Sequence, residues 1–106
     1  MVQIPNKVIL LIKQFISDLN DNNIVISRAI LFGSYAHGAY NEWSDIDIAL
    51  VSDDFIGDRF ADRNIIRKIK LSVSSDLEPI PYTTKSFSSD DPFVKNILET
   101  GIAITL

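Results

Sequence analysis

The chain has 106 residues, of which 46% are hydrophobic and 23% charged, with a formal net charge of -4 and no cysteine. This length and composition predict one globular domain over residues 1–106 and exclude disulfides and thiolate metal sites. The negative charge disfavours nucleic acid as the main partner, because proteins that bind along a duplex usually present a basic surface.

The first helix and strand are predicted in the N-terminal third. Apolar residues recur at helical spacing from Val8 to Leu19, and a polar run at 20–23 ends the helix. The apolar run in this helix is interrupted by Lys13 and is shorter than the ~20 apolar residues that a membrane span needs. We therefore expect a cytoplasmic protein without membrane contact. The β-branched segment 24–32 then runs into Gly33, which is typical of a strand that ends in a tight turn.

The second strand is expected to carry acidic side chains on one face. Residues 36–41 fit a short helix or an ordered loop before it. Within 44–51 the side chains alternate, so that Asp45 and Asp47 share a face with Ala49. The opposite face is apolar and should pack in the core, while the acidic face is expected to carry the chemistry.

Residues 58–71 predict a second long helix. Ala61, Ile65 and Ile69 recur at helical spacing and give it an apolar side. A basic stripe on the same segment is interpreted as a solvated face, with a docking surface for an acidic partner as the alternative. The stripe consists of Arg59, Arg63, Arg67 and Lys70.

A third strand is predicted at 75–82, where Asp76 and Glu78 occupy alternate positions. Pro79 and Pro81 each remove a backbone donor. Because both losses fall on the same side of the strand, that side is expected to be unpaired.

The C-terminal segment predicts a last helix and a short strand. Asp91 and Pro92 are an N-cap residue and a first-turn proline, and Gly101 is a natural helix stop. The alternating residues of 102–106 indicate the final strand. The buried side of the helix is expected to consist of Val94, Ile97 and Leu98.

Asp45 and Asp47 form a candidate metal site. On a strand their Cα atoms are ~6.6 Å apart and their side chains point the same way. Their repulsion and lost solvation are destabilising, and a hard divalent cation such as Mg²⁺ is the simplest compensation. A third carboxylate on a neighbouring strand would complete a two-ion site of the phosphoryl-transfer kind. Gly33 and Ser34 could hold phosphate oxygens, which together with the metal indicates a nucleoside triphosphate.

The order Gly33-Ser34, ten residues, Asp45-Ile46-Asp47 resembles the signature of the polymerase-beta-like nucleotidyltransferase superfamily. LFGSYAHG followed by SDIDIALV looks like its minimal branch, the antitoxin component of HEPN/MNT toxin–antitoxin pairs. The resemblance is dense over residues 28–51. It implies an α/β (α+β) domain in which a mixed sheet has helices packed mainly on one face. It also implies transfer of a nucleoside monophosphate, AMP from ATP, to an acceptor with release of pyrophosphate.

Several residues acquire roles through this resemblance. Gly33 and Ser34 would bind the triphosphate. His37 stands where an arginine often occurs in the motif, and it could contact phosphate or the acceptor. The residues that would hold two Mg²⁺ ions and support catalysis are Asp45, Asp47 and Glu78, with Asp76 as the alternate third carboxylate.

The same resemblance implies a partner protein. In this reading the acceptor is a helical HEPN toxin, and the chain acts as an antitoxin by adenylylating it. The alternative is a binding module that neutralises the toxin by occlusion, with a vestigial active site. Transfer to a small-molecule acceptor is a third and less favoured hypothesis, because no acceptor-binding lobe accompanies the motif. Self-association is left open.

Overall fold

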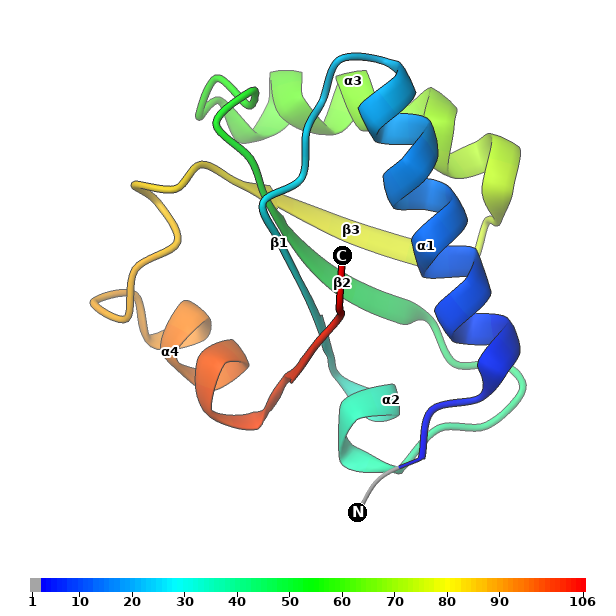
Figure 1. Cartoon of the computed structure of the whole chain (residues 1–106). Helices are drawn as coiled ribbons and strands as arrows, with labels where there is room; N and C mark the ends of the chain where they lie inside the picture. Colours follow the sequence, from blue (N-terminus) through cyan, green and yellow to red (C-terminus); the bar gives the residue numbers. More distant parts are fainter. Residues whose placement is uncertain (1–2) are drawn as a thin grey trace.

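A mixed four-stranded β-sheet is the centre of the domain, which the computed structural model describes over residues 3–106, apart from the side chain of Arg59. In chain order the elements are α1 (Asn6–Asp21), β1 (Arg28–Phe32), α2 (Ser34–His37), β2 (Ile46–Val51), α3 (Arg59–Val73), β3 (Leu77–Tyr82), α4 (Pro92–Thr100) and β4 (Ile102–Ala103). The strands lie in the order β3-β2-β1-β4, and only the β2–β3 pair is parallel (Figure 1).

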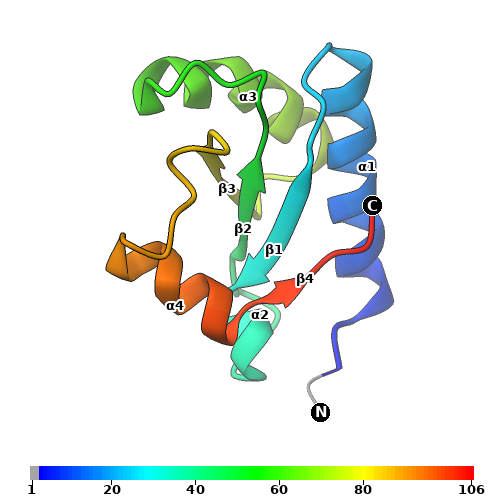
Figure 2. The same cartoon turned by 60° about the vertical axis from the view of Figure 1, so that its left-hand side comes forward.

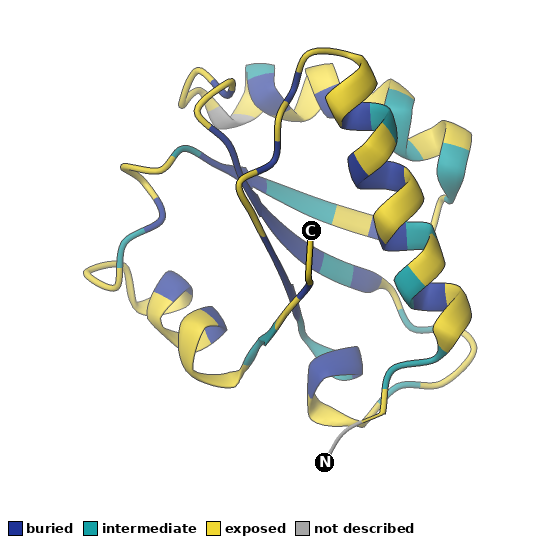
Figure 3. Cartoon of the chain, in the orientation of Figure 1, coloured by how far each residue is buried: buried dark blue, intermediate teal, exposed yellow. Residues whose placement is uncertain are grey.

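Helices cover the two faces of the sheet unequally. The larger core lies between the sheet and the helices α1 and α3, with α4 on the opposite side (Figures 2 and 3). Buried residues of this larger core include Ile12, Phe15, Leu31, Ile48 and Ile66. The expected α+β fold, with helices mainly on one face, is confirmed. Within the described residues, no helix is long and apolar enough to cross a membrane.

The second face of β2 is only partly available for chemistry. Ala49 and Val51 are buried in a smaller core under α4, together with Val94 and Ile97. The expectation that this whole face carries chemistry is therefore wrong for the C-terminal half of the strand. Asp47 lies beyond the cover of α4, so the open part of the face is the acidic end.

The strand β3 lies at the edge of the sheet, and the backbone nitrogens of its prolines face away from β2. The carbonyls of Asp76, just before β3, and of Tyr82 accept from the β2 side, from Ile46 N at 2.8 Å and Ser52 N at 3.0 Å. Because strand groups alternate in direction, Pro79 and Pro81 lie on the unpaired side, as predicted. An edge without donors is a poor template for pairing with another strand.

All four strands are shorter than predicted, and the first and last differ most. The first begins at Arg28 rather than at residue 24, because Ile24 and Ile26 are buried in the core from a connecting segment outside the strand. The last covers Ile102–Ala103 only. In the last segment Ile104 is buried outside the strand, whereas Leu106 is 58% exposed. Burial of an apolar residue therefore does not require strand pairing.

The buried side of α3 is rotated from the predicted one. Ile65 is 46% exposed, whereas Ile66 is 1% exposed. Buried Asp62 accepts hydrogen bonds from Ile56 N at 2.9 Å and Gly57 N at 3.0 Å. This link between the helix and the preceding loop turns residues 62 and 66 inward, and sequence spacing contains no sign of it.

The short helix α4 ends where Gly101 meets the sheet. Gly101 is the C-cap of α4, as predicted, but its φ of -78° lies outside the left-handed region, so another reason explains the glycine. A Cβ there would lie 2.5 Å from both Ile30 Cγ2 and the carbonyl oxygen of Ile97. Glycine is required because α4 approaches β1 closely. The helix buries Val94 and Ile97, but Leu98 is 38% exposed, contrary to expectation.

We expect Gly101→Ala to destabilise the domain by about 1 to 3 kcal/mol, because the added methyl group meets backbone and a packed side chain. Urea unfolding would measure the change. Thr100→Ala is the matched control, since Thr100 is exposed and substitutions at such positions usually stay within about 0.5 kcal/mol. Equal stability of Gly101→Ala and the wild type would contradict this account of the contact.

Candidate nucleotidyltransferase site

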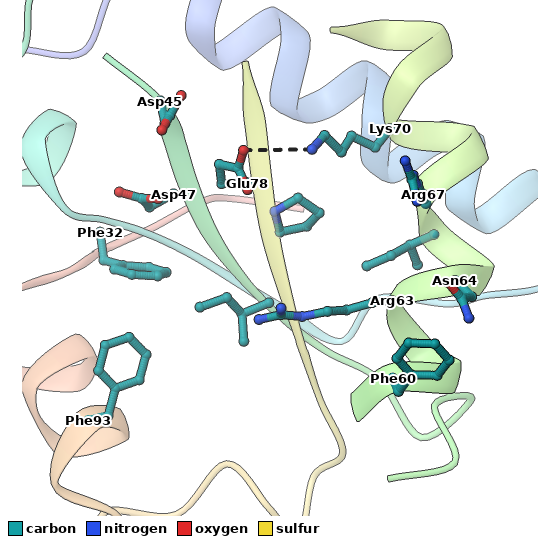
Figure 4. A pocket seen from close by; sticks show the side chains of 13 residues that line it. Phe32, Asp45, Asp47, Phe60, Arg63, Asn64, Arg67, Lys70, Glu78 and Phe93 are labelled. Carbon is teal, nitrogen blue, oxygen red and sulfur yellow. Dashed lines mark ion pairs between the residues drawn. The ribbon is translucent and has the colours of Figure 1, made fainter. Parts of the chain in front are cut away.

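A cleft of about 770 Å³ lies between the acidic end of the sheet and α3 (Figure 4). The strands supply its acidic side and α3 supplies its basic side. Its acidic residues are Asp45, Asp47 and Glu78, its basic residues are Arg63, Arg67 and Lys70, and its aromatic residues are Phe32, Phe60 and Phe93.

Strand pairing brings the three acidic side chains together. Asp47 is opposite Glu78 in the parallel β2–β3 pair and opposite Phe32 in the antiparallel β1–β2 pair. Asp45 lies two residues earlier, just before β2, and lines the same cleft. The structure thus brings together the three carboxylates that sequence analysis singled out.

The carboxylate of Asp47 is held in an unfavourable environment. Burial raises its pKa above the usual value of 3.8, and the negative charges of Asp45 and Glu78 raise the pKa further. Both causes disfavour the ionised form. The group is therefore one that a bound cation would stabilise.

The donor chemistry of the cleft fits Mg²⁺, which prefers carboxylate oxygens. Within residues 3–106, however, no three acidic or histidine side chains already form a compact metal-binding group. Glu78 instead forms an ion pair with α3, where Lys70 Nζ lies 3.7 Å from its Oε1. The carboxylates fit Mg²⁺ because they are of the right chemical type and line the same cleft. To bind the metal, Glu78 would exchange its ion pair with Lys70 for one with Mg²⁺.

Gly33 connects the β1–α2 corner to the acidic residues. Its φ of +73° is in the region that favours glycine, and a Cβ would overlap the carboxylate of Asp47. Its carbonyl accepts from Ala36 N and His37 N, both at 3.1 Å, which begins α2. Gly33 therefore lies against the site, although neither it nor Ser34 lines the cleft itself.

Two other predicted residues lie outside the cleft. His37 is exposed at the end of α2. Asp76 precedes β3, so it does not follow the alternation that directs Glu78 into the cleft. It lines a second pocket beside Tyr35, whose pKa is raised by burial and then by the charge of Asp76. Of the two carboxylates considered for the third position, the structure brings Glu78 to Asp45 and Asp47.

The basic residues of α3 were not predicted to belong to the site. We call Arg63, Arg67 and Lys70 the basic wall; Figure 4 shows them across the cleft from the carboxylates. Arg59, the fourth member of the predicted stripe, has a side chain outside the described part of the structure. Arg63 and Arg67 are exposed, as expected for a solvated face, but all three residues also line the cleft. Their spacing at i, i+4 and i+7 was visible, but which way the helix faced was not.

Comparison with known proteins identifies the family. The nucleotidyltransferase domain family matches residues 12–104. A candidate protein adenylyltransferase of Methanocaldococcus jannaschii is 34% identical over 94 residues, which cover 85% of this chain and 90% of that protein.

Two solved structures share the fold, each with a TM-score of 0.64 and each matched over 92% of this chain. One is a candidate nucleotidyltransferase from Sulfolobus solfataricus, 18% identical and matched over 78% of its length. The other is a toxin–antitoxin complex with AMP-PNP, 24% identical over 72% of the matched chain. The family match and the Methanocaldococcus jannaschii relative show that the chain belongs to the nucleotidyltransferase domain family and that nucleotidyl transfer is its class of activity.

Proposed function

We propose that this protein transfers AMP from ATP to a hydroxyl group of a partner protein, using Mg²⁺ held by Asp45, Asp47 and Glu78. The observation that carries the proposal is the convergence of these carboxylates from adjoining strands in one cleft. The raised pKa of Asp47 and its contact with Gly33 support the same arrangement.

The chain's own residues have distinct roles in this reaction. Backbone amides and the hydroxyl at Gly33-Ser34 hold the triphosphate, and His37 stays near that corner as an accessory group. Bound Mg²⁺ supplies neutralisation of the phosphate charge. The acceptor oxygen bonds to the α-phosphorus as the bond to the bridging oxygen of pyrophosphate breaks. The hydroxyl proton passes to the carboxylate of Glu78.

A protein acceptor is supported by the relatives. The Methanocaldococcus jannaschii protein is named for protein adenylylation, and the AMP-PNP complex is a toxin–antitoxin pair. The sequence motif resembles the minimal branch that accompanies HEPN toxins. We therefore propose a cytoplasmic antitoxin whose acceptor is a helical HEPN toxin.

The second candidate function is neutralisation by occlusion without catalysis. The ion pair between Lys70 and Glu78 favours it, because this pair occupies one of the three proposed metal ligands. The two candidates differ in whether the carboxylates are needed. In a growth assay with the toxin, Asp45→Asn and Asp47→Asn leave protection intact under occlusion and abolish it under adenylylation.

The central test is labelling of a co-expressed HEPN partner. With Mg²⁺ and ATP labelled at the α-phosphate, we expect the wild type to label the partner and Asp47→Asn to reduce the rate at least about 100-fold, since it removes a charge from the reacting centre. Asp21→Asn, at the exposed end of α1, is the control and should label normally. Labelling at the wild-type rate by Asp47→Asn would refute the assigned role.

Removing the charge of Asp47 should also stabilise the metal-free protein. Because the folded-state pKa lies above 3.8, ionised Asp47 costs stability at pH 7, and this cost disappears as pH falls through the raised pKa. We expect Asp47→Asn to raise the melting temperature at pH 7 and to lose this advantage in acid. Mg²⁺ should stabilise the wild type but not the variant. A lower melting temperature for Asp47→Asn at pH 7 without metal would contradict the electrostatic account.

A further inference from the structure

We propose that the basic wall of α3 binds acidic side chains that flank the acceptor hydroxyl, so that α3 selects the partner segment to be modified. This inference rests on the proposed function. It assigns an acceptor class, an acidic polypeptide segment, to a surface that lies beyond the predicted catalytic residues.

The position of the wall separates it from the donor site. Gly33 directly follows β1. Asp45 directly precedes β2, Asp47 lies on β2, and Glu78 lies on edge strand β3. The helix α3 contacts β3 and lies beyond it, on the far side of the carboxylates from Phe32, the residue before Gly33 (Figure 4). A triphosphate held at Gly33 and the carboxylates therefore leaves the α3 side of the cleft for the acceptor.

The two arginines of the wall are available to a ligand. Both are exposed, and among the described residues the ion pair of the cleft joins Lys70 to Glu78, leaving Arg63 and Arg67 without an acidic partner. Like charges four residues apart destabilise a helix by about 0.2–0.5 kcal/mol.

Arginine pairs suit carboxylates in particular. A guanidinium group donates two parallel hydrogen bonds to one carboxylate, which adds geometric selection to charge attraction. In Figure 4, Arg63 extends from α3 toward the strands, so a carboxylate bound there would hold its chain in the cleft that Glu78 also lines. An acidic residue next to the acceptor hydroxyl would thus position that hydroxyl at the reacting end of the cleft.

A polypeptide fits the cleft better than RNA. Asp45, Asp47 and Glu78 line the opposite side, and the whole chain has a net charge of -4, both of which repel a continuous phosphate backbone. The aromatic rim, with Phe60 at 78% and Phe93 at 48% exposure, offers contact area to peptide side chains. Aromatic groups also stack on bases, so RNA is included as an arm of the test.

The test measures binding by fluorescence polarisation with the full chain, in the presence and absence of Mg²⁺ and a non-hydrolysable ATP analogue. The probes are a peptide with tyrosine between glutamates, the same peptide with lysines, and oligoadenylate RNA. We expect the wild type to prefer the glutamate peptide and the double variant Arg63→Glu/Arg67→Glu to weaken its binding about tenfold or more. Arg63→Gln/Arg67→Gln should give a smaller loss, and it decides the question if the charge-reversed variant does not fold.

The control variant is Lys13→Glu/Lys68→Glu, which makes the same change in net charge at exposed positions outside the cleft. It should bind the glutamate peptide like the wild type. The proposal is overturned if the control loses as much affinity as the wall variant, if the wild type does not bind the glutamate peptide, or if RNA binds more tightly and depends on the wall. Binding of the ATP analogue tests the proposed function separately. If the wild type does not bind the analogue, the proposed function is contradicted. If it binds the analogue but shows no preference among the peptides, only the role of the basic wall is contradicted.

Discussion

The contact between Gly33 and the carboxylate of Asp47 is the constraint on which the site depends. It requires β1 to end in a residue without a side chain, in a backbone conformation that glycine favours, at the point where β2 presents an acid. The antiparallel pairing of β1 with β2 sets this approach, and the parallel pairing with β3 adds Glu78 from the other side. The sheet therefore concentrates negative charge where apolar packing alone would avoid it.

This concentration explains why the rest of the domain is arranged asymmetrically. The core under α1 and α3 is large and continuous, whereas α4 covers only part of the opposite face. A complete cover would bury the carboxylates without water or a counter-charge, which is costly. The stability of the fold comes mainly from one face, and the other face keeps an open acidic end.

Local sequence pattern predicted most of the secondary structure and the acidic face of β2. Strand alternation was sufficient to place Asp45 and Asp47 on the same face, and the two prolines were sufficient to identify an edge strand. Two features could not be predicted because they depend on tertiary contacts. The register of β3 decided between Asp76 and Glu78, and the rotation of α3 directed the basic wall into the cleft. The roles assigned to the carboxylates and to Gly33-Ser34 stay predictions.

The buried carboxylate of Asp62 has a consequence for recognition as well as for packing. It is held by two loop amides and immediately precedes Arg63, so it sets the angular phase of the whole helix. Successive residues on an α-helix are about 100° apart, so a shift of one position would turn the arginines away from the carboxylates. The loop before α3 thus helps to fix the direction in which the arginines point. Changes in the length or sequence of this loop would change partner selectivity without altering any residue that contacts the nucleotide.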